Sequence, residues 1–342
     1  MIYKFVNFPV FIEVKNNIIS NLEEIIKNNS LYFKKPLVIT GNRTKEIIKD
    51  FLKDKDYYVY KEFNKDFINM REKVIDGNYD LIIACGGGTI IDIGKYLSHE
   101  TLIPMISVPT LLSSDAISSP ISIIRINNEY KSFGTTMPIG VIVDLDIIKN
   151  SPKEYILAGL GDLISNISAS YDWLLASKKI KEKVDNFSRL LSYMPAINII
   201  NKIKDYESIK DLSFLEDLAY GLILSGISMN IAHSSRPASG SEHNISHALD
   251  KILKDKRKLH GLQVGFSTIL TTYLQKQYDI HEKILRLYKK FDFPTDLSSI
   301  KIDKESFINA LKLAPRIRNR YCILNEYSLD SIEKICKEIN IF

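Results

Sequence analysis

Short apolar runs alternate with helical segments through the first 150 residues, and this alternation constrains the fold more than any other feature. Each apolar run is followed by turn residues and then by apolar side chains at helical spacing. The predicted strands are 36–40, 56–60, 80–85, 105–108 and 141–143, and the predicted helices are 44–52, 67–76 and 90–97. Such alternation predicts a parallel sheet covered by helices.

The pattern changes near residue 150. Just before it, segments 122–126 and 130–133 flank Asn127-Asn128, which predicts a β-hairpin. Ser151-Pro152 then predicts a helix start, with Ser151 as N-cap and Pro152 as the first helical residue. The rest of the chain has helical periodicity without a convincing strand. We therefore predict two domains, an α/β domain at 1–150 and an all-helical domain at 151–342.

The composition excludes several classes of protein. The chain has 342 residues, 45% hydrophobic and 25% charged, which suits two folded globular domains. The net charge is +5, but the sequence has no Lys/Arg run typical of nucleic-acid binding. The three cysteines form no C-x-x-C pair, which excludes a structural zinc site built from cysteines. The longest apolar stretch, 219–232, is interrupted by glycine and polar residues, which predicts a buried helix. We expect a cytoplasmic homo-oligomer, dimer or larger, without a membrane segment or a nucleic-acid partner.

Three consecutive glycines, Gly86 to Gly88, lie between a predicted strand and a predicted helix that carries Asp92 and Lys95. Glycine lets the backbone approach a phosphate closely, and a helix N-terminus adds free N–H groups and partial positive charge. The spacing G-G-G-x-x-x-D-x-x-K differs from the G-x-G-x-x-G fingerprint. The pattern favours a dinucleotide pyrophosphate site. A tight turn that needs glycine is the alternative.

A serine-rich segment follows the strand that ends at Thr110. Ligands bind at the carboxyl ends of strands in open α/β sheets, so polar side chains here are candidate ligand contacts. The candidates are the hydroxyls of Thr110, Ser113 and Ser119 and the carboxylate of Asp115. A serine-rich loop that caps a helix explains the composition equally well.

Histidines and one carboxylate in the second half form a candidate metal site. His243 and His247 are four residues apart and share a helix face, and His260 follows seventeen residues after His243. Asp162 interrupts an apolar helical stretch, where a carboxylate needs a partner. Three ligands of this type with an open position are typical of catalytic zinc. Spacing alone permits Asp162 with any two of the three histidines.

Arg316, Arg318 and Arg320 alternate shortly before Cys322. Guanidinium groups suit phosphate contacts because their planar fork matches the oxygens. We interpret these three arginines as a solvated or interface segment.

Several motifs together resemble a known family. In chain order they read GGGTIIDIGK, VPTLLSSDAISSP, AGLGD, DWLLA, SRPASGSEHNISHALD, HGLQVG and RNRYCIL. This set is similar to the sn-glycerol-1-phosphate dehydrogenase family, within the group of iron-type alcohol dehydrogenases, glycerol dehydrogenases and dehydroquinate synthases. The likeness runs from about residue 36 to about residue 325 and is most specific over 235–250. Ala116 and Cys322 depart from the family, which usually has Gly and Thr there.

The resemblance implies a dehydroquinate synthase-like fold, with an active site between the α/β and helical domains. It implies zinc, or another divalent ion, on Asp162, His243 and His260, and substrate contacts from Asp115, Asp162 and His247. We expect Asp162 and His247 to be catalytic. The residues predicted to bind NAD or NADP are Gly86, Gly87, Gly88, Thr89, Ile90, Ile91, Asp92, Thr110, Leu111, Ser113 and Ser119.

The implied reaction is reduction of a small phosphorylated ketone, dihydroxyacetone phosphate, to sn-glycerol 1-phosphate by hydride transfer to a metal-polarised carbonyl. The proton would come from water or from His247. Lys95, Arg236 and the 316–320 arginines are candidates for the phosphate. A glycerol dehydrogenase with an unphosphorylated substrate and a sugar-phosphate cyclase are the rivals, although cyclases usually have Glu at position 162. A non-catalytic nucleotide-binding subunit is the alternative from another class.

Overall fold

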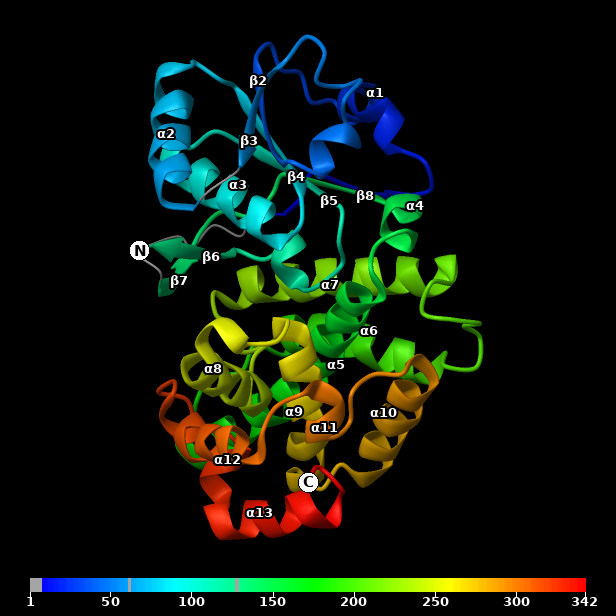
Figure 1. The fold of residues 1–342 in the computed structure, drawn as a ribbon, viewed down its shortest axis with the longest axis vertical. Helices are drawn as coiled ribbons and strands as arrows, with labels where there is room; N and C mark the ends of the chain where they lie inside the picture. The colour runs from blue at the N-terminus through cyan, green and yellow to red at the C-terminus, as the bar shows by residue number, and fades with distance from the viewer. Residues whose placement is uncertain (1–7, 61–62, 127–128) are drawn as a thin grey trace. The chain divides into compact units, whose positions relative to one another are not determined.

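The computed structural model describes residues 8–60, 63–126 and 129–342 of the chain (Figure 1). It contains two compact units, an N-terminal unit, Met1–Ser151, and a C-terminal unit, Pro152–Phe342. The boundary between the units, after Ser151, lies one residue beyond the boundary predicted from the sequence, after residue 150. The binding roles that the sequence suggests for the two domains remain predictions.

A six-stranded parallel sheet forms the centre of the N-terminal unit, as predicted. Its spatial order is β1-β8-β5-β4-β2-β3. The strands are β1 (Phe11–Lys15), β2 (Pro36–Gly41), β3 (Asp56–Tyr60), β4 (Leu81–Gly86), β5 (Met105–Pro109) and β8 (Gly140–Asp144). An antiparallel pair, β6 (Ile121–Ile126) and β7 (Glu129–Gly134), confirms the predicted hairpin strands. The predicted turn residues, Asn127-Asn128, lie outside the described part of the chain.

The strand order places a topological switch between β2 and β4. The chain leaves β2 toward β3 on one side, and it leaves β4 toward β5 on the other side. Thr44, just after β2, links the two strand ends because its hydroxyl donates to the carbonyl of Cys85 at 3.3 Å. Ligands of open α/β sheets bind outside the carboxyl ends of strands at such a point. The glycine segment 86–88 begins at the end of β4 and therefore lies at this position.

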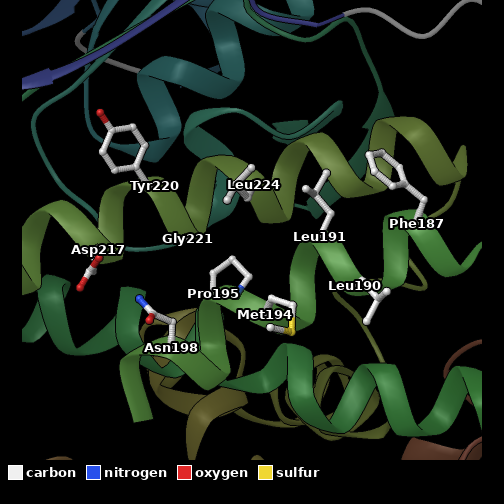
Figure 2. Close-up of a pocket in the computed structure, with 10 residues that line it drawn as sticks. All are labelled: Phe187, Leu190, Leu191, Met194, Pro195, Asn198, Asp217, Tyr220, Gly221 and Leu224. Carbon is white, nitrogen blue, oxygen red and sulfur yellow. The ribbon is translucent and has the colours of Figure 1, made fainter. Parts of the chain in front are cut away.

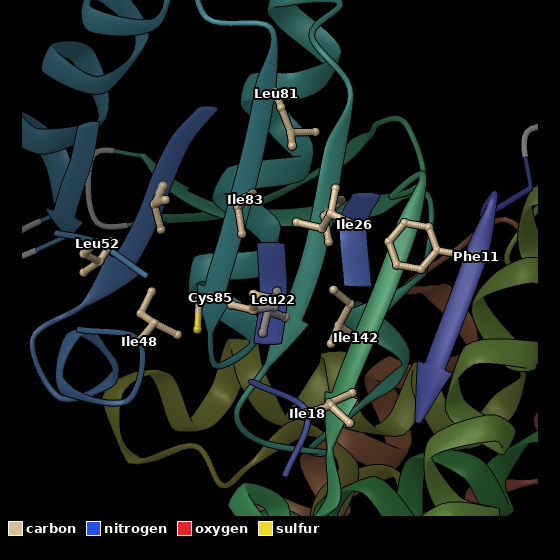
Figure 3. Packing of buried hydrophobic residues seen from close by; sticks show 13 residues of the cluster. Phe11, Ile18, Leu22, Ile26, Ile48, Leu52, Leu81, Ile83, Cys85 and Ile142 are labelled. Carbon is tan, nitrogen blue, oxygen red and sulfur yellow. The ribbon is translucent and has the colours of Figure 1, made fainter. Parts of the chain in front are cut away.

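Alternate residues of β4 are buried on opposite faces of the sheet. Leu81, Ile83 and Cys85 pack with α1 (Leu22–Asn28) on one face (Figure 3). Ile82 and Ala84 pack on the other face. That face is covered by α2 (Phe63–Asp76) and α3 (Gly88–Thr101). Burial on both faces explains why this strand reads as a continuous apolar run.

One expectation for the N-terminal unit was wrong, and one strand was missed. The predicted helix 44–52 is a 3₁₀ turn at Thr44–Glu46 followed by turns. The Thr44 hydroxyl accepts from the N–H of Gly41 at 2.8 Å and closes the chain into a turn, while Ile48 and Leu52 still face the core. Strand β1 was missed because it is short and its outer position leaves Ile12 and Glu13 half-buried. Asp144 caps the short helix α4 (Leu145–Lys149), and its carboxylate accepts the N–H groups of Asp146 and Ile147.

The C-terminal unit consists of helices and connecting loops and has no strand in residues 152–342, all of which the structure describes. Helix α5 lies against α6, α7, α8 and α9. The helices are α5 (Lys153–Ile180), α6 (Asn186–Asn201), α7 (Leu212–Ala232), α8 (Ser241–Leu253), α9 (His260–Leu274), α10 (Tyr278–Phe291), α11 (Leu297–Ile300), α12 (Lys304–Leu313) and α13 (Leu329–Glu338). The predicted start of α5 is shifted by one residue, because Pro152 occupies the N-cap and Ser151 makes no cap bond.

Helix α7 contains the apolar stretch 219–232. Among the described helices it alone combines the length and mean hydropathy, 1.3, of a membrane span, and 67% of that window is buried inside the protein. Such burial is characteristic of a core helix, as the sequence predicted. Residues of α6 and α7 line an apolar groove between these helices, Met194 and Leu224 among them (Figure 2). None of the predicted site residues lines this groove.

Candidate functional site

Helix α3 begins directly after β4, and its N-terminus carries the glycine segment. Gly87 is the N-cap, and no described side chain caps the helix there. A Cβ added at Gly86 would lie 2.8 Å from Ile90, and one added at Gly87 would lie 3.0 Å from Leu111. A Cβ added at Gly88 would meet nothing within 4 Å. Close packing therefore explains the first two glycines, while the third borders open space beside uncapped N–H groups.

The segment after β5 lies beside the glycines. The N–H of Thr110 donates to the carbonyl of Gly86 at 3.0 Å, and Thr110 itself is buried. Leu111 packs on Gly87. The predicted nucleotide-binding residues 86–91 and 110–111 are thus neighbours in this unit, around the carboxyl ends of β4 and β5. Ser113 is half-buried in the loop that follows.

Asp115 starts a 3₁₀ helix, Asp115–Ile117, that is capped by Ser114. Ala116, one of the two departures from the family pattern, supplies the N–H that Ser114 accepts at 3.4 Å. The carbonyl of Asp115 accepts from Ser118 and Ser119. Ser114 therefore caps a helix, as the alternative explanation of this serine-rich loop predicted. The predicted substrate role of Asp115 remains a prediction.

Asp92 and Lys95 are buried, and their side chains pair with each other at 2.9 Å. Asp92 also accepts from the N–H of Ile123 at 3.1 Å, and Lys95 donates to the carbonyl of Ile121 at 2.5 Å. Ser119 is buried beside Lys95, 3.5 Å from its Nζ atom. These contacts fix α3 to β6, so the structure does not favour Asp92 as a nucleotide ligand or Lys95 as a phosphate ligand.

In the C-terminal unit, Asp162, His243 and His260 converge from α5, α8 and α9. One ligand atom from each lies within 4.8 Å of the others. The Nε2 atoms of His243 and His260 are each 3.8 Å from Oδ1 of Asp162. Asp162 and His243 are buried, and the side chain of His260 is 31% exposed. The chain thus brings together one of the three triples that spacing had left open.

Glycines next to two of these residues explain how the helices come so close. A Cβ on Gly161 would lie 2.2 Å from the carbonyl oxygen of Gly261, and a Cβ on Gly261 would lie 1.9 Å from that of Ala158. No real side chain tolerates such distances, so α5 and α9 meet backbone to backbone. Gly161 precedes Asp162 and Gly261 follows His260. The AGLGD and HGLQVG motifs therefore place two ligands together through helix packing.

The outer nitrogens of both histidines have polar partners. Nδ1 of His243 is 2.9 Å from Oε1 of the buried Glu242, and Nδ1 of His260 is 3.3 Å from the hydroxyl of Ser246. Gln263 donates to that hydroxyl at 3.1 Å. These contacts leave the Nε2 atoms directed at Asp162. Sequence reasoning missed Glu242, Ser246 and Gln263, although Glu242 directly precedes His243.

His247 lies one helical turn after His243, with its ring centroid 5.8 Å from that of His260. Its Nε2 atom accepts from Nη2 of Arg318 at 2.5 Å. Because a guanidinium cannot accept, the proton of the neutral ring is on Nδ1. His247 is therefore beside the three-residue cluster without being part of it.

The arginine segment, predicted to be solvated or at an interface, is only partly exposed. Arg318 and Arg320 are half-buried and donate to Ser239 and Ser235 at 2.5 Å and 2.9 Å, whereas Arg316 is exposed. Burial, together with the charge of Arg318, lowers the pKa of Arg320 to about 10. Two guanidinium groups thus lie close together beside the histidines, and such a pair favours an anion.

Arg236, another phosphate candidate, is occupied elsewhere. It is buried, forms a two-pronged ion pair with Glu182 and donates to the carbonyl of Tyr321 at 3.0 Å. Its role is to hold the arginine segment against the start of α8.

The cluster has the chemistry of a divalent metal site. Burial lowers the pKa of His243 well below its ordinary value and also lowers that of His260, which favours the neutral rings that bind metal. A carboxylate and two imidazoles with polar partners behind the rings match catalytic zinc, although other divalent ions accept such ligands. The open space at Gly88 and the uncapped helix start likewise fit a pyrophosphate.

The fold and the cluster define a class of protein. A family model described as iron-containing alcohol dehydrogenase matches residues 13–152. A crystal structure of a probable glycerol dehydrogenase from Sinorhizobium meliloti has a TM-score of 0.79 at 17% identity, covering 99% of this chain and 98% of that one. A maleylacetate reductase from Agrobacterium tumefaciens has a TM-score of 0.74 at 14% identity and 99% coverage of both chains. The fold is that of the iron-containing alcohol dehydrogenases.

Closer relatives define the family. A glycerol-1-phosphate dehydrogenase (NAD(P)+) of Methanococcus aeolicus is 38% identical, covering 97% of this chain and 98% of the relative. One from Archaeoglobus fulgidus is 35% identical over 95% and 94%. The chain belongs to the glycerol-1-phosphate dehydrogenase family and is an oxidoreductase, as the sequence motifs indicated.

Proposed function

We propose that this chain catalyses the reversible NAD(P)H-dependent reduction of dihydroxyacetone phosphate to sn-glycerol 1-phosphate with a divalent metal, predicted to be zinc. The observation that carries the proposal is the convergence of Asp162, His243 and His260 from three helices within 4.8 Å. The names and the full-length similarity of its relatives support the substrate and the cofactor. Assembly as a homo-oligomer and location in the cytoplasm remain predictions.

Asp162, His243 and His260 would hold the metal, and residues 86–91 with Thr110, Leu111, Ser113 and Ser119 would hold the nucleotide. When bound, the metal supplies a Lewis acid for the ketone oxygen and the nicotinamide supplies the hydride. Asp115 and Asp162 are predicted to bind substrate hydroxyl or carbonyl groups. His247 presents an Nδ1–H donor, because Arg318 occupies its other nitrogen. His247 would therefore orient substrate through a hydrogen bond.

Arg318 and Arg320 support a phosphorylated substrate over free dihydroxyacetone. Arg318 donates to His247, and the charge of Arg320 also acts on His247. Burial of both guanidinium groups reduces the water that competes with an anion for them. Hydrogen bonds between charged groups contribute about 1.5–3 kcal/mol each, which corresponds to roughly 10- to 100-fold in binding. This observation separates the proposal from its nearest rival, a glycerol dehydrogenase.

An assay of both ketones with NADH and NADPH tests the reaction. We expect kcat/KM for dihydroxyacetone phosphate to exceed that for dihydroxyacetone by about 100-fold or more, and Arg320→Met to remove most of this difference. Arg316→Met, in the exposed arginine of the same segment, is the matched control and should change neither value. Equal turnover of the two ketones by the unmodified protein would establish the glycerol dehydrogenase instead.

Metal removal tests the other half of the proposal. Chelator treatment should abolish NAD(P)H oxidation, and added Zn²⁺ or another divalent ion should restore it. If the chelated and restored proteins turn over equally fast, the metal has no role. Consumption of a sugar phosphate without net change in NADH would indicate a cyclase, and metal binding without turnover would indicate a non-catalytic subunit.

A further inference from the structure

Glu242 is a fully buried carboxylate that the proposed reaction does not use. It lies in the first turn of α8, directly before His243, and its exposed fraction is 0%. Its Oε1 atom is 2.9 Å from Nδ1 of His243 and accepts the N–H of Gly240 at 2.6 Å. A buried carboxylate is costly unless its hydrogen bonds compensate, so its contact with a metal-site histidine requires an explanation.

The two nitrogens of His243 have different surroundings. Nε2 faces Asp162, 3.8 Å away, and Nδ1 faces Glu242. When ionised, the Glu242 carboxylate can only accept, so the proton of the neutral ring is then on Nδ1 and the lone pair on Nε2 points toward the cluster. In the other tautomer the Nδ1 lone pair would face the carboxylate, and Nε2 would carry a proton where a metal must bind. The carboxylate thus selects the ring form that can act as a ligand.

We propose that Glu242 is a positioning residue that fixes the tautomer and orientation of His243 and thereby sets the metal affinity of the cluster. The inference rests on the proposed metal site. Partners behind ligating histidines typically contribute 10- to 100-fold in metal affinity, because they increase the basicity of the ring and hold it in place.

Capping of helix α8 is the competing role for Glu242, because its carboxylate also accepts the N–H of Gly240. A second buried carboxylate makes the two roles separable. Asp172 accepts the N–H of Ser241 at 2.7 Å, at the same helix start. Its other oxygen accepts from Gln275 and Ile323 at 3.1 Å and 2.9 Å. Asp172 therefore supports the start of α8 without touching His243.

The experiment measures Zn²⁺ affinity of the metal-stripped full chain by competition with a chromogenic chelator. Glu242→Leu should bind Zn²⁺ about 10- to 100-fold more weakly than the unmodified protein. Glu242→Gln should recover much of that loss, since its amide oxygen still accepts from Nδ1. Asp172→Asn, the matched control, should bind within a fewfold of the unmodified protein. Co²⁺ substituted into each protein should show a changed absorption spectrum in Glu242→Leu alone.

Equal Zn²⁺ affinity of Glu242→Leu and the unmodified protein overturns the inference and leaves the proposed function intact. Equal losses in Glu242→Leu and Asp172→Asn also overturn it, since they indicate support of the helix start. An unmodified protein that binds no Zn²⁺ overturns the proposed metal site as well. Should Glu242→Leu fail to fold, ¹⁵N-histidine NMR of the unmodified metal-free protein decides: His243 must carry its proton on Nδ1, and a proton on Nε2 refutes the inference.

Discussion

The two candidate binding regions, the glycine segment in the N-terminal unit and the three-residue cluster in the C-terminal unit, are built in opposite ways. The glycine segment is three consecutive residues at one strand end, and it offers backbone N–H groups and open space. The cluster takes one side chain from each of α5, α8 and α9, with carboxylates buried behind it. One region depends on local sequence, and the other depends on helix packing over long chain distances.

This difference predicts how each region should respond to change. A site made of backbone at a helix start survives most substitutions outside its own few residues. A site made of side chains on three helices depends on every contact that fixes the spacing of those helices, because metal ligands tolerate only a few tenths of an ångström. Substitutions that act on one region and leave the other unchanged therefore test the comparison.

The largest expected effect is that of His243→Ala. Losing one of three ligands removes several kcal/mol of metal binding and carbonyl activation, so turnover should fall by roughly 10³-fold or more. Affinity for NADH, measured by fluorescence titration, should stay within a fewfold of the unmodified protein. A parallel fall in NADH affinity would break the comparison, since the two regions would then share their determinants. Retained stoichiometric zinc would contradict the ligand role of His243.

The buried carboxylate Asp172 should make the stability of the protein pH-dependent. Burial, with the nearby charge of Glu242, raises the pKa of Asp172 from 3.8 to about 6, so the folded chain binds this proton more tightly than the unfolded chain. Protonated Asp172 therefore adds about 3 kcal/mol to the free energy of unfolding below about pH 4, and this contribution is lost as the pH rises through about 6. Urea unfolding of the metal-free protein should show this fall in the free energy of unfolding between about pH 4 and pH 6, and urea unfolding of metal-free Asp172→Asn should lack it. Parallel pH profiles of the two proteins would contradict it.

Local signals were read correctly from the sequence. The apolar run 80–85, the glycines and the helix after them are adjacent in the chain, so their period and turn chemistry predict a strand, a sharp connection and a helix, as observed. The prediction of a helix at 44–52 was wrong for a local reason too. The Thr44 hydroxyl closes a turn, which the spacing of apolar residues does not reveal. Asp162 was predicted because a charge in an apolar helix needs partners.

The partners of the site side chains could not be read from spacing. Glu242 looks like an ordinary acidic residue in a first helical turn, and its role depends on the ring of His243 turning back toward it. Arg318 lies far along the chain from His247, and alternation of arginines is equally typical of a solvated segment. The choice of His243 and His260 over His247 also came from family resemblance, since four-residue spacing treats His243 and His247 alike.

The backbone contact between α5 and α9 gives the next effect. In Gly261→Ala the new methyl group would overlap the carbonyl of Ala158, which cannot move without shifting the helix. We expect a loss of 1–3 kcal/mol of stability and about tenfold weaker metal binding, with unchanged NADH affinity. Gly221→Ala is the matched control, because its methyl group meets the flexible end of the Leu163 side chain and no backbone carbonyl. Equal zinc affinities for the two variants would contradict the prediction, since metal binding would then not depend on the spacing of α5 and α9.

The smallest effect is expected at Gly88, where the comparison is sharpest. The space beside Gly88 is open, and alanine favours a helix start over glycine, so Gly88→Ala should fold as stably as the unmodified protein. If a pyrophosphate approaches the backbone there, the added methyl group should weaken NADH and NADPH binding by about tenfold, or about 1.4 kcal/mol, and leave zinc affinity unchanged. Gly134→Ala is the matched control, because it also adds a methyl group in open space, on β7. Equal nucleotide affinities for the two variants would mean that the nucleotide does not approach Gly88, and the third glycine would then lack a binding role.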